Sequence, residues 1–573
     1  MKTHPLIPIL MTLLVAAFGL LGWRVYYLQH DCRGRYEQIA YRSRHATVIE
    51  SPKRGDIFDR RSRVLAGSSK MEQLFAEPRA FKTNDQILEC SMQLQDILGV
   101  PGPDICRLIQ ESRNPGFVRL YENLSSDQRQ EILKARLPGI GIQGIWQRSY
   151  PMGAVTSHII GFVGAEKKGF GGIEQKYDAD LQGTAGSDVL VVDVGRNPIR
   201  MDPGESRAAQ NGYSLVLTID TVIQDIVRKA VQKRIQEYEA DYGLGIVMDP
   251  WTGEILAMVS LPDYDPTNFS EYAARKNDPL KNRVVADPYE PGSIFKPIAA
   301  SVALDAGAID YNDVIFCENG YFSRYKISEY MNHVYGNLSV KMIIAKSSNI
   351  GMAKIGLKLG QKRLHDGLRL FGFGQSTGLD LPGEDAGIFR PTNKWDGWTV
   401  TRIPFGHAIS VTAIQILRAY CIIANGGSAV APHIVRAVVD DQGTIRKYVY
   451  PAPLTGYIIK PEVAKWIREE ALVAVVNEGT GDQAKLKDIQ TFGKTGTANI
   501  AIPGGRGYDT ANYIASFVGG APPEKPELMV LVSIGRPNRA LGKGYSGGRV
   551  AAPVFKEIME EILKYRHTQQ PEQ

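Results

Sequence analysis

Strand-like sequence lies on both sides of a long helical stretch in the second half of the chain, and this order of elements restricts the possible folds. Two apolar runs in GLGIVMDPWTGEILAMVS (Gly243–Ser260) flank a D-P-W-T-G turn, which is a β-hairpin signal. Helical patterns dominate from Ser293 to about Ala424. Two more strands, ANYIASFVGGAP and ELMVLVSIG, precede a closing helix in AAPVFKEIMEEILKY. This order predicts an α+β fold, an antiparallel sheet packed by helices.

The segment from Leu6 to Trp23, LIPILMTLLVAAFGLLGW, has no charged residue in 18 positions. At about 1.5 Å per residue, a helix of this length nearly crosses the hydrocarbon core of a bilayer. The following VYYL sequence extends it into an aromatic interface. A cleaved signal peptide is the alternative, but the run is long and no A-x-A-like site closes it. We therefore predict a transmembrane anchor at residues 6–28, preceded by a short tail of residues 1–5.

The remainder of the chain divides near residue 210. Residues 41–207 contain many Gly and Pro turn points and no long helical period, so we expect a mixed, extended module that acts as a pedestal. Residues 210–566 begin with the alternating SLVLTID and the helical TVIQDIVRKAVQKRIQEY, and they hold the α+β domain. Two or three domains are the expected number for 573 residues.

Composition excludes several classes of function. A net charge of +6 without clustered Lys and Arg suits an anionic membrane or wall, but it does not indicate nucleic-acid binding. None of the five cysteines forms a C-x-x-C pair and the nine histidines have no ligand spacing, so we expect no metal and no cofactor. Cys90 and Cys106 could pair in an oxidising compartment, which the sequence leaves open.

The stretch EPGSIFKPIAA places a serine after a Pro-Gly corner and a lysine three residues later. A helix that starts near Ser293 puts Lys296 on the same face, and Pro297 is compatible with its first turn. Serine is a weak nucleophile that needs a base close by, and a lysine can serve if its pKa falls. Ser293 and Ser323 are the two serines in the chain with lysine at i+3, and only Ser293 follows a Pro-Gly corner. The pattern is nevertheless short, and alone it fits a helix start with an exposed lysine.

Two further motifs follow in order. The sequence AKSSNIGMAKIG contains Ser347-x-Asn349, and FGKTGTANI contains the only K-T-G of the chain, at Lys494-Thr495-Gly496 followed by Thr497. The series S-x-x-K, S-x-N and K-T-G is the signature of penicillin-binding proteins and serine β-lactamases. Lys494 would be the second cation that lowers the pKa of Lys296.

The rest of the chain resembles class B penicillin-binding proteins, and the division-type members most closely. RGDIFDRRSRVLA is similar to their R-G-x-I-x-D-R-x-G-x-x-L-A opening, except that Ser62 stands in the usual glycine place. NRVVADPYEPGSIFKP, FGHAISVTAIQILRAY and YIASFVGGAPPEKPELMVLVSIG extend the likeness. The match runs from Arg54 to the closing helix.

The resemblance implies a serine-type D-Ala-D-Ala transpeptidase that crosslinks peptidoglycan stem peptides during septal wall synthesis and binds β-lactams. Ser347 would relay protons, Asn349 would hold a substrate amide, and Thr495, Gly496 and the Lys494 strand would bind the peptide by its backbone. By the same analogy, the N–H groups of Ser293 and Thr497 would form the oxyanion hole.

The resemblance also implies a location and partners. Five arginines soon after the span would place the body of the chain in the cytoplasm by the positive-inside rule. The family acts outside the cytoplasmic membrane, so we instead expect a single-pass inner-membrane protein with a periplasmic or extracellular catalytic domain. The expected partners are a polytopic membrane glycosyltransferase, other division proteins and nascent peptidoglycan, with no nucleic acid. We also expect Arg54, Asp56, Asp59 and Arg60 to form an ion-paired hinge that meets the glycosyltransferase.

Several other functions are weighed against this one. The choice of a division-type over an elongation-type transpeptidase rests on sequence similarity alone. A β-lactam hydrolase or sensor of class A type needs an E-x-x-x-N segment between S-x-N and K-T-G, and no glutamate in that interval has asparagine at i+4. A non-enzymatic division scaffold is disfavoured by the intact Ser293, Lys296 and Lys494. A bifunctional class A synthase would need a glycosyltransferase-sized module before the pedestal.

Overall fold

The computed structural model describes residues 6–193, 198–201, 204, 206–275, 277–449, 456–501 and 507–568. The predicted tail of residues 1–5 lies outside this part of the chain. The chain packs as two compact units. The smaller comprises residues up to Lys53, Lys70–Trp146 and Gly183–Gly212, and the larger comprises Arg54–Ser69, Gln147–Gln182 and the chain from Tyr213 onwards. All eight predicted site residues belong to the larger unit.

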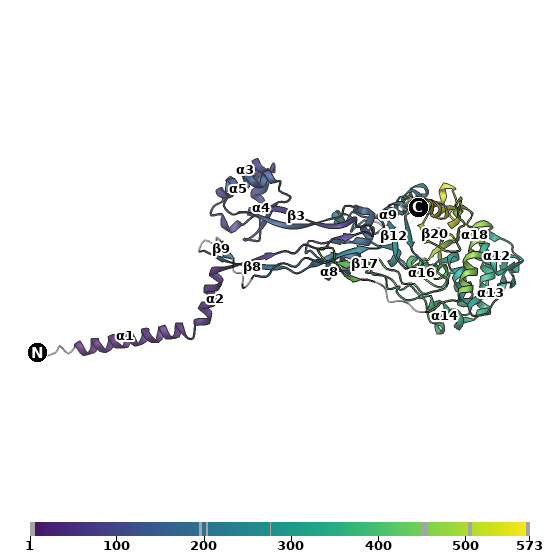
Figure 1. The fold of residues 1–573 in the computed structure, drawn as a ribbon, viewed down its shortest axis with the longest axis horizontal. Helices are drawn as coiled ribbons and strands as arrows, with labels where there is room; N and C mark the ends of the chain where they lie inside the picture. Colours follow the sequence, from purple (N-terminus) through teal and green to yellow (C-terminus); the bar gives the residue numbers. More distant parts are fainter. Residues whose placement is uncertain are drawn as a thin grey trace. The chain divides into compact units, whose positions relative to one another are not determined.

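A five-stranded antiparallel sheet forms the centre of the larger unit, in the order β12-β11-β21-β20-β19 (Figure 1). The predicted hairpin is present, with Gly243 paired to Leu261 and Val247 to Ala257. The predicted α+β fold is therefore confirmed, and the K-T-G sequence lies on the edge strand β19. The strands are β11 (Tyr242–Met248), β12 (Ile255–Leu261), β19 (Phe492–Ala501), β20 (Tyr508–Ala521) and β21 (Leu528–Gly535).

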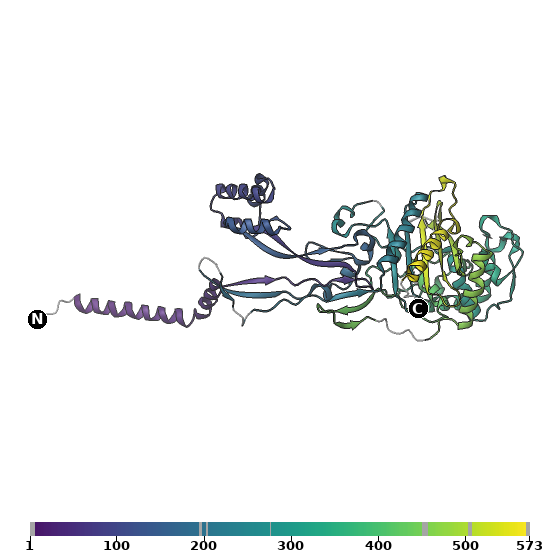
Figure 2. The same cartoon turned by 45° about the horizontal axis from the view of Figure 1, so that its top comes forward.

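Helices cover both faces of this sheet because its strands are apolar on both sides. On one face, Val530 and Val532 of β21 pack with α9 (Thr221–Tyr238) and α20 (Ala552–His567); Figure 2 shows α20, in yellow, beside the sheet. On the other face, Met529 and Leu531 pack with α16 (Ala413–Ala424). The larger unit also contains the helices α10 (Arg283–Ala286), α11 (Lys296–Asp305), α12 (Val340–Ala345), α13 (Asn349–Leu359), α14 (Gln361–Leu370), α15 (Thr399–Arg402), α17 (Pro461–Trp466), α18 (Leu472–Asn477) and α19 (Gly547–Val550).

The SLVLTID strand, β10 (Ser214–Leu217), lies outside the five-stranded sheet. It pairs in parallel with β2 (Ile57–Phe58) and antiparallel with β17 (Val435–Val439). The alternation of apolar residues identifies a strand but carries no information about its partners. β2 in turn pairs with the start of β3 (Val64–Ala76), so the predicted extended segments around a charged turn are present.

Buried polar contacts hold the R-G-D-I-F-D-R segment within the larger unit. Arg54, only 8% exposed, forms ion pairs of 2.7 Å with Glu174 and with Asp178. Asp59 is fully buried and accepts hydrogen bonds from the Arg63 backbone N–H and from the Thr221 hydroxyl. The charges therefore pair with other parts of the unit rather than with one another. Arg54 and Asp59 are too buried to form part of a partner surface.

Ser62 adopts left-handed backbone geometry, with φ of +61°. It closes a tight turn in which its N–H donates to the carbonyl of Asp59 at 3.1 Å. This conformation costs a residue with a Cβ atom about 1–2 kcal/mol, whereas glycine adopts it freely. The family pattern has glycine at this position, and the turn geometry gives the physical reason.

We expect Ser62→Gly to stabilise the protein by about 0.5–1 kcal/mol, because relief of the strain exceeds the extra chain entropy of glycine. Thermal unfolding of the full chain in detergent measures the effect. Ser62→Ala is the matched control, since it removes the hydroxyl but keeps Cβ and should give no gain. A lower melting temperature for the glycine variant would contradict the argument.

The smaller unit contains more helix than predicted. α3 (Asn84–Leu98) is 15 residues long, so the expectation of no long helical period in residues 41–207 was wrong. Its buried positions include Ile87, Leu94 and Leu98, the Thr83 side chain caps its start, and Gly99 ends it in left-handed geometry. The apolar residues of this helix recur at helical spacing in the sequence, but polar residues occupy the positions between them. The other elements are α2 (Arg33–Arg44), α4 (Gly102–Gln110), α5 (Ser126–Ala135), β1 (His45–Glu50), β4 (Val118–Tyr121), β8 (Gly186–Val192) and β9 (Pro198–Met201), and β5 (Ile140–Ser149) begins in this unit.

Cys90 and Cys106 are free and buried in the apolar cluster that α3 and α4 share. The first described helix, α1 (Leu6–Gln29), is long and apolar enough to cross a membrane, and none of its side chains is buried. Its bounds agree with the predicted span of residues 6–28 within one residue.

Candidate active site

A cavity of about 490 Å³ in the larger unit brings the three motifs together. Ser293, Ser347 and Asn349 line it, as do Thr495 and Thr497 of strand β19. Lys296 and Lys494 lie beneath this lining and have no exposed surface. Residues separated by about two hundred positions in the sequence therefore meet at one site.

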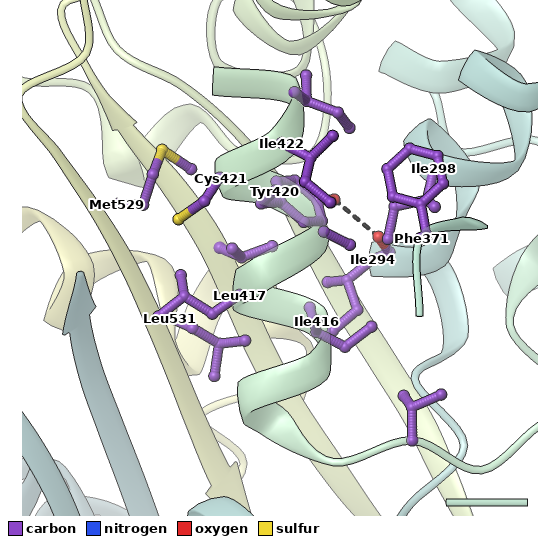
Figure 3. Close-up of a cluster of buried hydrophobic side chains, with 14 of the residues drawn as sticks. Ile294, Ile298, Phe371, Ile416, Leu417, Tyr420, Cys421, Ile422, Met529 and Leu531 are labelled. Carbon is purple, nitrogen blue, oxygen red and sulfur yellow. Dashed lines mark hydrogen bonds between the residues drawn. The ribbon is translucent and has the colours of Figure 1, made fainter. Parts of the chain in front are cut away.

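Ser293, the predicted nucleophile, lies on a short 3₁₀ turn, Gly292–Phe295, that leads into α11. In such a turn residues i and i+3 are superposed, so Lys296 lies directly below Ser293, and its N–H donates to the Ser293 carbonyl. Two contacts hold the turn. Gly292, with φ of +57°, donates its N–H to the Gly406 carbonyl at 3.1 Å. The Tyr420 hydroxyl of α16 donates to the carbonyl of Ile294 at 2.7 Å (Figure 3).

The hydroxyl of Ser347 links the two buried lysines. Lys296 Nζ and Lys494 Nζ each lie 3.1 Å from Ser347 Oγ. Lys296 also donates to the Ser347 carbonyl at 2.5 Å and to Asn349 Oδ1 at 2.8 Å. Ser347 has φ of +61°, a strained geometry that turns its carbonyl and its hydroxyl toward the same amine.

Burial lowers the pKa of both lysines, because an ammonium is poorly solvated in the protein interior. The pKa of Lys296 falls to about 7, although Glu329 nearby acts in the opposite direction. The charge of Lys296 further lowers the pKa of Lys494. With its lowered pKa, Lys296 is partly a neutral amine near neutral pH, and a lysine must be neutral to act as a base.

Strand β19 carries the K-T-G motif along the open edge of the sheet, next to the nucleophile turn. Gly496 is required by this closeness, since a Cβ atom there would lie 2.8 Å from Ile294 Cγ2. The Thr497 hydroxyl accepts from the Gly547 N–H at 3.1 Å, and Thr495 Oγ1 lies 2.5 Å from Thr480 Oγ1. An edge strand beside a nucleophile can pair with an extended peptide.

Asn349 is engaged within the protein on both sides of its amide. Its Oδ1 accepts from Lys296, and its Nδ2 donates to the Ser328 carbonyl at 3.1 Å. In this structure the side chain therefore positions the lysine.

Sequence reasoning missed Glu329, a buried carboxylate at the floor of the cavity. It accepts from Ser348 Oγ at 2.5 Å and from the N–H groups of Asn349 and Ile350. These bonds fix the S-x-N turn and place one negative charge near Lys296. No spacing in the sequence indicates the contact, because Glu329 reaches it from a loop in which Met331 has φ of +52°.

A second missed group is a hydrogen-bonded trio at the cavity wall. Glu290 Oε2 accepts from His407 Nδ1 and from the Tyr508 hydroxyl, both at 2.8 Å, and Oε1 accepts from the Ala408 N–H at 3.0 Å. These bonds lower the pKa of Glu290 although burial opposes them. The residues lie more than one hundred positions apart, so no local pattern could have joined them.

Comparison with known proteins agrees with this geometry. Residues 243–560 match the penicillin binding protein transpeptidase domain, and residues 49–217 match the penicillin-binding protein dimerisation domain. The peptidoglycan D,D-transpeptidase FtsI of Escherichia coli is 31% identical over 518 residues, which cover 90% of this chain and 84% of the relative. This chain belongs to the class B penicillin-binding proteins.

Other members of the family are also similar to this chain. Stage V sporulation protein D of Bacillus subtilis is 30% identical over 96% of this chain and 84% of its own length. The crystal structure of penicillin binding protein 3 from Mycobacterium tuberculosis, complexed with aztreonam, superposes with a TM-score of 0.70 at 25% identity, covering 91% of this chain and 97% of that one. Together with α1, these likenesses make the chain a membrane-anchored, single-pass member of the penicillin-binding proteins.

The glutamates between S-x-N and K-T-G stay away from the cavity of this penicillin-binding protein. Glu384, Glu462, Glu469, Glu470 and Glu478 are absent from the lining among the residues that the structure describes. Glu384 instead accepts from the N–H of Thr377. The carboxylate that does line the cavity, Glu329, already accepts from three donors, so it has little capacity left to activate a water molecule.

The described ranges contain no group of three or more His, Cys, Asp or Glu side chains arranged to hold a metal ion.

Proposed function

We propose that the protein is a peptidoglycan D,D-transpeptidase whose nucleophile is Ser293, and that it acts in septal wall synthesis. The observation that carries the assignment is the cavity in which the Ser293 turn, the lysine pair bridged by Ser347 and the edge strand β19 meet. Two relatives named FtsI, which match 90% or more of this chain, are peptidoglycan D,D-transpeptidases. We assign residues 210–566 to the catalytic domain and residues 41–207 to the pedestal.

In the first half of the reaction, Ser293 Oγ attacks the carbonyl of the penultimate D-Ala of a stem peptide, and neutral Lys296 accepts its proton. The peptide adds to β19 by backbone hydrogen bonds, and the N–H groups of Ser293 and Thr497 stabilise the oxyanion. The proton then passes through Ser347 to the departing D-Ala amine. Ser347 suits this relay because its hydroxyl contacts both lysines and can reverse its donor role.

A transpeptidase and a β-lactam hydrolase differ in the lifetime of their penicillin adduct. We expect the penicilloyl adduct of this protein to persist for hours, because Glu329, the carboxylate among the described lining residues, is already occupied by three donors and is not free to activate water. Mass spectrometry of the purified full chain after removal of free penicillin measures the adduct mass over time. A class A β-lactamase is the control, and loss of the adduct within seconds would favour the hydrolase.

Two further proposals, the side of the membrane and the role in division, rest on similarity to known family members. A catalytic domain outside the cytoplasmic membrane is proposed because the substrate is the wall, in spite of the arginines that follow α1. A division role is proposed on the likeness to FtsI, and the position of a fluorescent fusion in growing cells separates it from elongation.

We also propose a polytopic glycosyltransferase partner, and Arg60 is the member of the R-G-D-I-F-D-R segment suited to meet it. Its side chain is 28% exposed and pairs with Glu254 at 3.3 Å. We expect Arg60→Glu to leave penicillin binding and melting near wild type, since a partly exposed ion pair contributes at most about 1 kcal/mol. Activation of the glycosyltransferase in membranes should fail.

The charge-swapped double variant Arg60→Glu/Glu254→Arg separates the interface from simple pairing. It restores the ion pair with reversed polarity, so a purely structural role predicts recovery of partner activation. Under the interface proposal the double variant stays defective. Recovery, or wild-type activation in the single variant, would count against the interface.

A further inference from the structure

The mechanism above leaves the Glu290–His407–Tyr508 trio without a role, although it belongs to the wall of the active-site cavity. His407 and Tyr508 line the cavity, and Glu290 stands three residues before the nucleophile. The backbone ties the two segments together, since the Gly292 N–H donates to the Gly406 carbonyl at 3.1 Å. The residue next to Ser293 is thus hydrogen-bonded to the residue next to His407.

The hydrogen bonds determine which nitrogen of His407 carries the proton. The Glu290 carboxylate accepts from Nδ1 at 2.8 Å, and the Tyr508 hydroxyl donates to the same carboxylate oxygen. Nδ1 is therefore a donor, and in the neutral imidazole Nε2 keeps its lone pair. Nε2 has no hydrogen-bond partner among the residues that the structure describes. A carboxylate that orients an imidazole in this way makes the opposite nitrogen a proton acceptor.

The loop around His407 is held firmly in this position. Gly406 has φ of +83°, and a Cβ atom there would lie 2.1 Å from the Gly292 carbonyl oxygen. Ala408 has φ of +59°, and its N–H donates to Glu290 Oε1. Arg402, a cation that lines the same cavity, donates instead to the carbonyls of Tyr325 and Lys326. The imidazole is therefore oriented by the carboxylate.

The second half of the reaction needs a base of its own. The acceptor is a primary amine on a neighbouring stem, and an amine with a pKa near 10.4 arrives at neutral pH as an ammonium that cannot attack. Burial of Lys296 and Lys494 disfavours proton uptake at either amine, and a charge on Lys296 disfavours it further at Lys494. Glu329 already accepts from three donors. The Glu290–His407 side of the cavity is complementary to the acceptor ammonium, because it offers a carboxylate and an imidazole nitrogen that has no hydrogen-bond partner among the described residues.

We propose that His407, oriented by Glu290, is the base that deprotonates the acceptor amine. This inference rests on the proposed role of Ser293. His407 Nε2 takes one proton from the ammonium, and the freed nitrogen pair forms the C–N bond to the acyl carbon. The ester bond between that carbon and Ser293 Oγ breaks. A second amine proton passes through Lys296 to Ser293 Oγ, the third stays on the new amide, and His407 releases its proton to water.

The partition of the acyl-enzyme between aminolysis and hydrolysis tests the proposal. The full chain in detergent is acylated with a thioester donor peptide, and mass spectrometry gives the ratio of amide to acid product at pH 7. Two acceptors are compared: Nα-acetyl-lysine, which is an ammonium at this pH, and hydroxylamine, which is already neutral. Because both products come from one acyl-enzyme, the ratio is independent of how fast Ser293 is acylated.

We expect His407→Asn to lower the ratio for acetyl-lysine about 10²-fold, at the lower end of what a general base contributes. The ratio for hydroxylamine should be retained. Glu290→Gln, which keeps the shape of the site, should lower the acetyl-lysine ratio selectively but less. His333→Asn is the matched control, because His333 lines the same cavity and stacks on Tyr335 without a carboxylate partner.

Equal losses with both acceptors would overturn the proposal, since they would mean that His407 only shapes the pocket. An unchanged ratio in both His407→Asn and Glu290→Gln would overturn it as well. Failure of the transpeptidase function looks different: the wild-type chain would form no acyl-enzyme with the thioester donor. A poorly folded His407 variant is replaced by Glu290→Gln, whose selective loss alone supports the assignment.

Discussion

Replacement of Ser293 by alanine is expected to abolish covalent labelling by penicillin. Under the proposal the β-lactam carbonyl forms its bond with Ser293 Oγ, which lines the cavity, whereas the other serine with lysine at i+3, Ser323, is not among the described lining residues. The substitution removes one oxygen from a half-buried position, so the fold should persist. Labelling with a fluorescent penicillin, followed by gel electrophoresis and peptide mass mapping of the wild type, measures the loss and locates the adduct.

Ser328→Ala is the matched control, because Ser328 lines the same cavity and contacts Asn349 only through its backbone carbonyl. It should label like wild type, and the Ser293 variant should melt within a few degrees of wild type. Labelling that survives in Ser293→Ala, or an adduct mapped to Ser347, would remove Ser293 from its role.

We expect Lys296→Arg to reduce the rate of penicillin acylation by about 10²–10⁴-fold, the usual contribution of a general base. A guanidinium stays protonated at any accessible pH, so it cannot take the Ser293 proton. It must also fit where the lysine has no exposed surface. Stopped-flow acylation with a chromogenic β-lactam gives the rate, and a melting curve separates lost catalysis from lost folding.

The pH dependence of the acylation rate shows in which protonation state Lys296 is active. Burial disfavours the ammonium and lowers the pKa of Lys296 to about 7, so acylation by the wild type should rise as pH increases through about 7 and level off above it. This titration belongs to the Lys296–Lys494 pair rather than to one residue. The rise should be absent in Lys296→Arg.

Lys346→Arg is the control for the same chemical change at the cavity wall, where Lys346 donates to the Glu478 carbonyl. It should keep both the rate and the pH profile. Near-normal acylation in Lys296→Arg would exclude Lys296 as the base.

Short motifs in the sequence pointed to residues that the structure brings together at one cavity. Ser293, Lys296 and Lys494 could be singled out because the S-x-x-K and K-T-G motifs each have a local spacing, and their catalytic roles stay predictions. Glu329 and the Glu290–His407 pair were not found, because their roles arise only from contacts between loops distant in the chain. Left-handed geometry at Ser347 and Met331 shapes those loops, and no residue type there signals it.

The fold followed a similar rule. The hairpin of β11 and β12 and the strands β20 and β21 were predictable, since alternating or continuous apolar runs between turn residues identify strands. The partners of β10 were not, because a strand carries no label for its neighbours. Helix α3 was missed although its apolar stripe is regular, since polar residues fill the positions between its buried ones.

The hydrogen bond from Tyr420 to the Ile294 carbonyl has a consequence for the evolution of drug resistance. A β-lactam exerts selection through the residues it touches, yet the carbonyl that follows the nucleophile is held by a side chain with no exposed surface. If Ser293 is the nucleophile, we expect substitutions inside α16 to alter drug sensitivity while the wall of the cavity keeps its sequence. Surveillance limited to residues in contact with the drug would overlook this route to resistance.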